Sequence, residues 1–116
     1  MRRIVVTGLG LVSPLGCGSE LAWSRLLSAR SGLTALPDWA AVLPARVAGI
    51  VPTKVDDVDG GFDPDLVVPP KDQRKMDRFI LFALAAASEA IAQAAWTHSD
   101  AYSMERTATE IGRAHV

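Results

Sequence analysis

"PPKDQRKMDRFILFALAAA", residues 69–87, opens the segment with the clearest structural signature in the chain. From about Asp77, a good helix cap, through Ala95, nearly every residue favours a helix. Apolar residues form two stripes at helical spacing: Phe79, Ala83, Ala86, Ala90 and Ala94, and then Ile80, Leu84, Ala87, Ile91 and Ala95. We therefore expect a buried helix whose alanines let a neighbouring segment approach closely, in a core larger than this chain supplies.

Basic residues gather where this segment begins, at Lys71, Arg74, Lys75 and Arg78. A helix N-terminus carries a partial positive charge, so each cation there costs roughly a few tenths of a kcal/mol unless an anion compensates. Lys71, Arg74 and Lys75 are three and four residues apart, which places them on one side of any helical turn. The pattern fits a solvated charged face and a docking site for an anionic partner about equally.

The N-terminal part of the chain predicts a strand, a loop and a helix. Ile4–Val6 is a β-branched run without alternation, as in a strand buried on both faces of a parallel sheet. A glycine-rich loop follows over residues 8–18. Ser19 can cap a helix whose apolar positions recur at helical spacing, with Gly32 as its stop.

Residues 36–70 are rich in proline and contain the stretch "DDVDGGFDPD", which is typical of an exposed loop. Within this region, the side chains of residues 45–51 alternate between two faces well enough to predict a strand, although Gly49 weakens the prediction. After the long helix, "ERTATEIG", residues 105–112, begins like a further strand. The order of strand, helix, strand and helix predicts an α/β architecture that is unfinished.

Composition excludes several classes of protein. With 116 residues, 49% of them hydrophobic, the chain has the size and apolar content of one soluble globular domain. A formal net charge of -1 argues against general electrostatic binding to nucleic acid or membrane, so we expect neither as a partner. The N-terminal apolar run is interrupted by Gly8, Gly10 and Pro14 before it reaches the length of a secretory or membrane-spanning segment.

The loop "VTGLGLVSPLG", residues 6–16, raises the alternative of a nucleotide-binding reductase, because glycines after a strand can cradle a pyrophosphate. The spacing does not hold, since Ser13 stands where the third glycine is required. A tight loop packed inside the protein is the better interpretation. We expect no cofactor.

Cys17 is the single cysteine, so it forms no internal disulfide, and no cysteine or histidine pair has metal-ligand spacing. We expect no metal and a reducing compartment, with the cytoplasm as the default. A nucleophilic thiol needs a base or an electropositive environment, and the sequence pairs Cys17 with none. His98 follows a helix end and is expected in an exposed turn, and His115 lies in the C-terminal tail. Cys17 is therefore interpreted as a free structural cysteine, and no catalytic residue is assigned.

Several blocks occur together in an order that resembles the N-terminus of the β-ketoacyl-[acyl-carrier-protein] synthases, the type II condensing enzymes. The blocks are "RRIVVTGLGLVSPLGCG", the W-x-x-L-L-x-x-x-S-G pattern from Trp23 to Gly32, "AGIV", "FDP" and "PPKDQRKMDRFILFALAAA". The resemblance covers residues 2 to about 109.

The resemblance implies a thiolase-like fold, with layered α/β/α/β/α architecture in the complete enzyme, and a homodimer. It implies an acyltransferase that condenses an acyl thioester with malonyl-acyl carrier protein in fatty acid elongation and releases carbon dioxide. A polyketide ketosynthase or chain-length factor shares these blocks and remains an alternative. The family's catalytic cysteine and two histidines match nothing in this chain, so the segment is expected to be inactive alone.

One functional feature transfers by position. The basic residues of the family's K-x-Q-R-K-M-D segment belong to the surface that docks the acidic recognition helix of the acyl carrier protein. In this chain they are Lys71, Arg74 and Lys75. The resemblance therefore favours acyl carrier protein as the partner of the basic cluster.

The last seven residues, 110–116, read "EIGRAHV". A DNA sequence that encodes this heptapeptide matches, after its first base, the start of a common sequencing adapter. We therefore divide the chain into residues 1–109, the N-terminal part of a β-ketoacyl synthase domain, and residues 110–116, a tail expected to be non-native.

Overall fold

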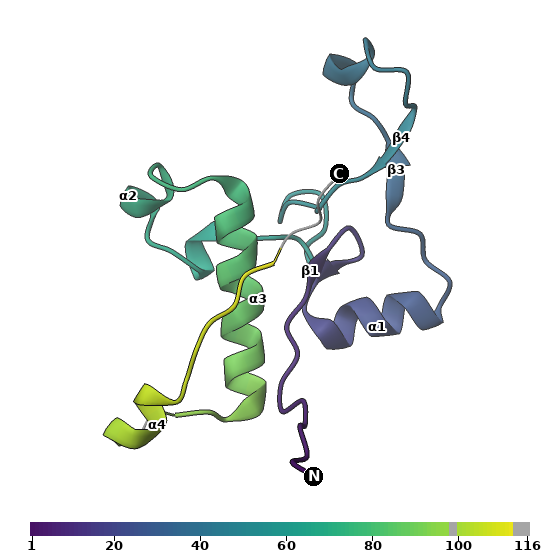
Figure 1. The fold of residues 1–116 in the computed structure, drawn as a ribbon. Helices are drawn as coiled ribbons and strands as arrows, with labels where there is room; N and C mark the ends of the chain where they lie inside the picture. Colours follow the sequence, from purple (N-terminus) through teal and green to yellow (C-terminus); the bar gives the residue numbers. More distant parts are fainter. Residues whose placement is uncertain (98–99, 113–116) are drawn as a thin grey trace.

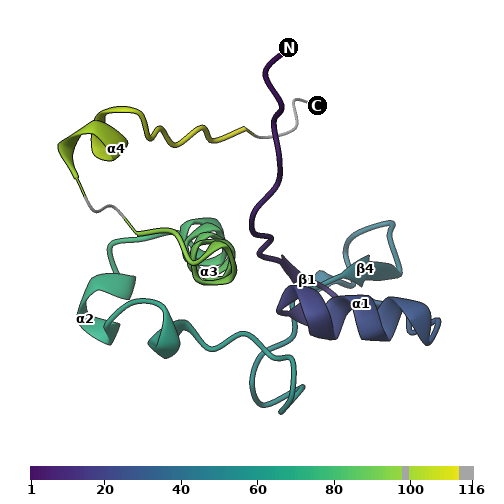
Figure 2. The ribbon, with the colours of Figure 1, turned by 90° about the horizontal axis from the view of Figure 1, so that it is seen from below.

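The computed structural model describes residues 1–97 and 100–112. Helix α3, Arg78–Ala94, stands at the centre, with the N-terminal loop and α1, Ser19–Leu27, on one side (Figure 1). A short helix, α2, Pro70–Gln73, lies beside the start of α3 on the other side in both views (Figures 1 and 2). The remaining elements are β1 Val12–Ser13, β2 Gly16–Cys17, β3 Leu33–Ala35, the 3-10 helix η1 Asp38–Ala40, β4 Val47–Gly49, the 3-10 helix η2 Pro64–Leu66 and α4 Ala101–Glu105.

Both sheets are small antiparallel hairpins. Strands β1 and β2 pair with Val12 opposite Cys17, and β3 and β4 pair with Leu33 opposite Gly49. The predicted strand at residues 45–51 is thus confirmed at its centre, with β3 as a partner that the sequence analysis did not anticipate. The β3–β4 hairpin projects away from α3 (Figure 1). The mixture of helices and strands fits the predicted α/β class.

The strand predicted at Ile4–Val6 is wrong for this structure. These residues form no strand, and their exposed fractions are 96%, 73% and 78%. A strand requires a neighbour for its backbone N–H and C=O groups. In Figure 2 the N-terminal segment runs apart from the helices, and no described residue pairs with it. Residues 106–112 likewise form no strand, and Glu105 ends α4 instead.

Helix boundaries follow the sequence signals in part. Helix α3 confirms the predicted long helix, with Asp77 in the capping position, although its carboxylate makes no capping hydrogen bond. Helix α1 begins at the predicted Ser19, but the cap position is Gly18. It ends at Leu27 rather than near Gly32, because the backbone turns into the left-handed region at Ala29, where φ is 57°.

The main core lies where α3 meets the loop that precedes α2. Its buried residues are Phe62, Val68 and Leu81, and the rings of Phe62 and Phe82 meet edge to face at 4.8 Å. The stretch predicted to be an exposed loop therefore contains a core residue, Phe62. Within α3, all of which the structure describes, only Leu81 is buried, so this chain alone does not supply the larger core in which the helix is expected to be buried.

Candidate functional site

The basic cluster predicted to bind a partner lies on α2 and the turn that follows it. Lys71 is in the helix, Arg74 occupies its C-terminal cap position, and Lys75 continues the helical turn by donating its backbone N–H to the Asp72 carbonyl at 3.0 Å. The three residues are therefore not at the N-terminus of α3, as the continuous pattern suggested. A turn separates the two helices, and of the four basic residues only Arg78 begins α3.

The three predicted side chains are all exposed, but they differ in their partners. Lys75 Nζ lies 2.9 Å from Asp72 Oδ1, in an ion pair three residues apart on the surface. Such pairs contribute little to stability, so Lys75 can exchange this partner at small cost. Lys71 and Arg74 form no ion pair or side-chain hydrogen bond with residues 1–97 or 100–112.

Polar and apolar contacts beneath the cluster hold α2 in place. The Gln73 amide nitrogen Nε2 donates to Asp65 Oδ1 and to the Val68 carbonyl, both at 2.8 Å. Asp63 caps η2 by accepting from the Asp65 N–H at 3.0 Å. Met76 packs against the core. These contacts thus fix the position of the segment that carries the three cations. The role of Gln73 was missed, since the sequence offers no sign of its distant partners.

The glycine-rich loop packs against α3. A Cβ added at Gly8 would lie 2.0 Å from the Ala90 carbonyl oxygen, and one at Gly10 would lie 1.7 Å from that of Ala86. These glycines thus allow the backbone of the loop to contact the backbone of α3, as the alanines of the helix predicted. The loop is tightly packed against α3, as predicted, but it is not internal in this structure, since only Gly16 within it is buried. The contacts at Gly8 and Gly10 fill the space that a phosphate would need, which disfavours the reductase alternative.

Glu89 joins this loop to the middle of α3. Its carboxylate accepts hydrogen bonds from the N–H groups of Leu11 at 2.9 Å and Ser19 at 2.7 Å, and from the Ser19 hydroxyl at 2.7 Å. Burial is the largest single influence on the pKa of Glu89 and raises it, but the three hydrogen bonds together outweigh burial and lower the pKa. Glu89 is therefore a weak base suited to holding the loop, and the Ser19 hydroxyl is engaged rather than capping α1.

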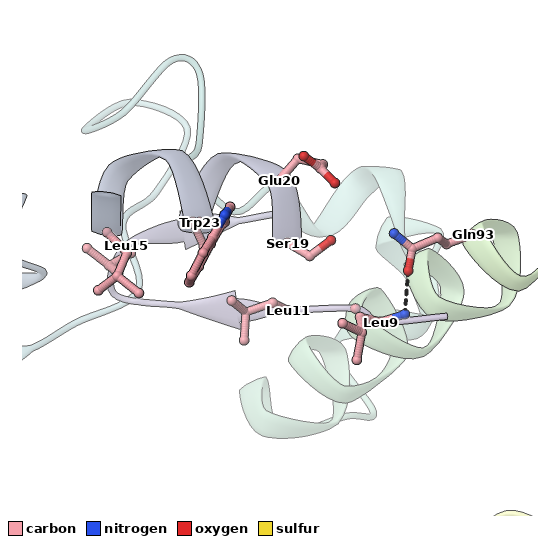
Figure 3. Close-up of a pocket in the computed structure, with 10 residues that line it drawn as sticks. Leu9, Leu11, Leu15, Ser19, Glu20, Trp23 and Gln93 are labelled. Atoms are coloured by element: carbon pink, nitrogen blue, oxygen red, sulfur yellow. Dashed lines mark hydrogen bonds between the residues drawn. The ribbon is translucent and has the colours of Figure 1, made fainter. Parts of the chain in front are cut away.

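An apolar cleft of about 380 Å³ lies between the loop and α1. Figure 3 shows Trp23 projecting from α1 toward the segment that carries Leu11 and Leu15. At one end the Leu9 N–H donates to Gln93 Oε1 at 2.6 Å (Figure 3). Most of the lining side chains are apolar, and the Ser19 hydroxyl among them already donates to Glu89.

A buried ion pair fixes the first helix to the loop before the core. The Arg25 guanidinium binds the Asp57 carboxylate through both nitrogens, with Nη2 to Oδ1 at 3.0 Å, and donates to the Leu15 carbonyl at 2.8 Å. The hydrogen bonds from Arg25 are the main cause of a pKa of Asp57 far below its ordinary value. Sequence reasoning missed this pair, because 32 residues separate its members.

Cys17 lies in β2, half-buried, where its N–H donates to the Gly60 carbonyl at 2.8 Å. Burial, the main influence, raises the pKa of the thiol, and nearby Asp57 and Glu89 raise it further against the opposing effect of Lys54. The thiolate is disfavoured, in agreement with a structural cysteine. His98 and His115 both lie outside the described residues.

Among the described residues, no group of acidic, cysteine or histidine side chains could hold a metal ion. In the same part of the chain, no helix has the length and apolar character needed to cross a membrane.

Comparisons with known proteins agree with the sequence blocks. The chain matches the family described as "Beta-ketoacyl synthase, N-terminal domain" over residues 1–115. It is 46% identical over 97 residues to the 3-oxoacyl-[acyl-carrier-protein] synthase 2 of Rhizobium meliloti, covering 83% of this chain and 23% of that protein. It is 35% identical over 126 residues to the mitochondrial 3-oxoacyl-[acyl-carrier-protein] synthase of Arabidopsis thaliana, covering 96% and 26%.

A protein of Streptomyces coelicolor named as a polyketide beta-ketoacyl synthase 2 is 39% identical over 100 residues, covering 85% of this chain and 22% of that protein. The chain therefore spans about a quarter of the length of these relatives. Since the family match extends over residues 1–115, the chain belongs to the β-ketoacyl synthase family and corresponds to its N-terminal domain.

Proposed function

We propose that this chain is the N-terminal part of a 3-oxoacyl-[acyl-carrier-protein] synthase of fatty acid elongation. In the complete enzyme, a cysteine thiolate attacks an acyl thioester, forms the acyl-enzyme and releases the carrier thiol. Malonyl-acyl carrier protein then loses carbon dioxide, and the resulting carbanion attacks the acyl-enzyme carbonyl. The products are the 3-oxoacyl-carrier thioester and the regenerated cysteine. Since that cysteine and the two assisting histidines match no residue here, the chain alone is inactive.

The contribution of this segment is to dock the carrier protein through Lys71, Arg74 and Lys75. The observation that carries the proposal is that Lys71 and Arg74 are exposed and lack partners among the described residues, while Lys75 holds only a surface ion pair. Because the whole chain has a formal net charge of -1, this positive character is local. An acidic helix is complementary to such a cluster, and charge complementarity mainly sets encounter rate and partner choice.

The test uses the complete enzyme that contains this segment. Lys71→Glu, Arg74→Glu and Lys75→Glu are combined, and kcat/KM is measured with malonyl-acyl carrier protein and, separately, with malonyl-coenzyme A. We expect a loss of about tenfold or more in kcat/KM for the carrier-bound substrate. The coenzyme A reaction should be nearly unchanged, because it does not use the docking surface.

The matched control reverses three exposed basic residues elsewhere, Arg2, Arg30 and Arg46, so that net charge changes equally. An equal loss in the control, or no loss in the cluster variant, would contradict docking at α2. Absence of any condensation by the complete enzyme would contradict the proposed reaction itself.

The larger architecture is part of the same proposal. The layered thiolase-like fold and the homodimer would cover the exposed strand candidate at Ile4–Val6 and the apolar cleft beside Trp23. We place the enzyme in the cytoplasm, with no cofactor. A role in polyketide synthesis is the second candidate, supported by the 39% identity to the Streptomyces coelicolor protein. Product analysis of the complete enzyme separates the two.

A further inference from the structure

Asp59 and Gly60 form an aspartyl–glycyl peptide bond in the loop that Arg25 binds through Asp57. Such a bond has a chemistry of its own, because the backbone nitrogen of the glycine can attack the side-chain carboxyl of the preceding aspartate. Glycine favours this attack, since it has no side chain to hinder ring closure. The Asp59 side chain is exposed to water, whereas Gly60 is buried. The two residues lie before α2 and are separate from the proposed docking surface.

The packing around Gly60 requires a glycine after the aspartate. A Cβ at this position would lie 2.6 Å from Arg25 Nη1 and 2.6 Å from Leu21 Cδ2. The guanidinium of Arg25 is held in place, because it binds the Asp57 carboxylate and donates to the Leu15 carbonyl at 2.8 Å. A larger residue at position 60 would therefore displace this ion pair, and the fold retains the reactive dipeptide.

Asp57 engages the nitrogen that would attack. The Gly60 N–H donates to Asp57 Oδ1 at 3.0 Å, and the same oxygen accepts from Arg25 Nη2 at 3.0 Å. The Gly61 N–H closes the turn by donating to the Asp57 carbonyl at 2.7 Å. Ring closure requires the peptide group of Gly60 to lose its proton and to turn toward the Asp59 carboxyl. The reaction therefore has to wait for a local opening of this turn.

We propose that Asp59 is a site of isoaspartate formation, and that the ion pair between Arg25 and Asp57 keeps it unreactive in the folded protein. The Gly60 nitrogen forms a bond to Cγ of the protonated Asp59 carboxyl and loses its proton, while the carboxyl hydroxyl leaves, so that one water is released. The product is a succinimide ring. Water then opens the ring at the main-chain carbonyl to give isoaspartate, or at the side-chain carbonyl to restore aspartate, and the water released is thereby regained.

Isoaspartate would change the structure of the loop, because its backbone runs through Cβ and Cγ of residue 59 and is one carbon longer. The Gly60 carbonyl accepts from the Cys17 N–H at 2.8 Å, and the Phe62 N–H donates to the Pro52 carbonyl at 2.8 Å. A longer turn displaces both hydrogen bonds. The modification should therefore loosen the contact of this loop with β2 and with the core residue Phe62.

The first experiment incubates the complete enzyme in mildly acidic buffer, in parallel with a synthetic peptide of residues 55–63. Isoaspartate is quantified by enzymatic methylation with isoaspartyl methyltransferase and is assigned to residue 59 by fragmentation in a mass spectrometer. We expect the peptide to form isoaspartate about tenfold faster or more, since it needs no local opening. Equal rates in the peptide and the folded enzyme would overturn the proposal.

The second experiment compares variants of the complete enzyme. Asp57→Ala should raise the rate at residue 59 about tenfold, because the Gly60 N–H loses its bond to a charged acceptor. Asp57→Asn keeps an oxygen that can accept from this N–H, so its increase should be smaller. Glu89→Ala is the matched control, because it removes a carboxylate with three hydrogen bonds elsewhere, and it should leave the rate at residue 59 unchanged.

The chemistry is checked by adding Asp59→Glu to the Asp57→Ala variant. Glutamate would have to form a larger ring, which closes far more slowly, so the methylated product at residue 59 should disappear. A rate in Asp57→Ala that is unchanged or lower, or an equal increase in Glu89→Ala, would overturn the protective role of the ion pair. Both results are independent of carrier-protein binding and leave the proposed docking untouched.

Discussion

Two polar side chains, Glu89 and Arg25, make contacts that span long stretches of sequence. The Glu89 carboxylate accepts hydrogen bonds from three donors on Leu11 and Ser19, which lie 78 and 70 residues earlier in the sequence. The Arg25 guanidinium binds the Asp57 carboxylate, 32 residues later in the sequence. In both cases a charged group replaces lost hydration with several hydrogen bonds, which is the condition for its burial to be tolerated. Removing either side chain would leave the groups that it binds without a hydrogen-bonding partner.

Replacing Glu89 by alanine should destabilise the attachment of the loop by roughly 1–3 kcal/mol, because three donors lose a common acceptor. The amides of Leu11 and Ser19 report this loss directly through faster hydrogen exchange. Ser88→Ala, at an exposed position beside it, is the control and should leave both amides protected. Unchanged protection in Glu89→Ala would show that the loop is held by other contacts.

The same carboxylate predicts a dependence on pH. Its pKa is lower in the folded chain than its ordinary value of 4.5, so its stabilising contribution is present above pH 4.5 and is lost as pH falls through the lowered pKa. Protection of the Leu11 and Ser19 amides should decline over that acidic range. In Glu89→Gln, which cannot titrate, the acid-dependent part of the decline should be smaller.

The ion pair between Arg25 and Asp57 predicts coupling between two mutations. Arg25→Ala and Asp57→Ala should each lower the thermal midpoint by several degrees, since each leaves the charge of the other residue without its partner in a site that is largely buried. The double variant should lose less than the sum of the two single losses, as is expected for partners in contact. Additive losses in a thermal denaturation series of the complete enzyme would mean that the pair contributes no mutual stabilisation.

At the scale of elements, helices α1 and α3 were predictable, whereas of the strands that the structure describes only β4 was. Helices α1 and α3 follow from hydrophobic periodicity and helix-forming residues, which are local properties. The strand expected at Ile4–Val6 depends on a neighbouring strand, and none of the described residues provides one. The start of α3 after Asp77 was predicted, but the separate helix α2 was missed, because the basic residues run continuously into the helix-forming segment. Spacing places Lys71, Arg74 and Lys75 on one side of a helical turn, but the contacts of Gln73 that hold this turn required the fold.

The approach of the loop to α3 is tested by adding one methyl group. A Cβ at Gly10 would lie 1.7 Å from the Ala86 carbonyl oxygen, so Gly10→Ala must push the loop away from the helix. Overpacking of this kind costs about 1–3 kcal/mol, which chemical denaturation of the complete enzyme can measure. Ser88→Ala, at an exposed position of α3, is the control. Equal stability of the two variants would contradict the close approach.

At the scale of the whole molecule, the chain is more extended than an independent domain of its length. Its radius of gyration is 17.1 Å, whereas 116 residues in a compact domain give about 13 Å. Its accessible surface is 9786 Å², against about 6,100 Å² for a compact monomer of this mass. Large apolar side chains contribute to the excess, among them Trp23, Leu26 and Phe79, with exposed fractions of 58%, 55% and 65%.

We therefore predict that the isolated 116-residue chain associates or folds incompletely. It should bind the dye 1-anilinonaphthalene-8-sulfonate strongly and sediment as a mixture of species at micromolar concentration. A soluble monomer that melts cooperatively without binding the dye would contradict this prediction. The non-native origin of residues 110–116 also stays a prediction, and the last four of them lie outside the described residues.

The central claim is that the surface on α2 recognises an acidic carrier protein. The most direct measurement is the dissociation constant of the complete enzyme for acyl carrier protein, at low and at physiological salt, with and without reversal of Lys71, Arg74 and Lys75. The account predicts tight, salt-sensitive binding that the reversal weakens by about tenfold or more at low salt, with the thermal midpoint unchanged. Equal affinity of the two proteins at low salt would contradict it.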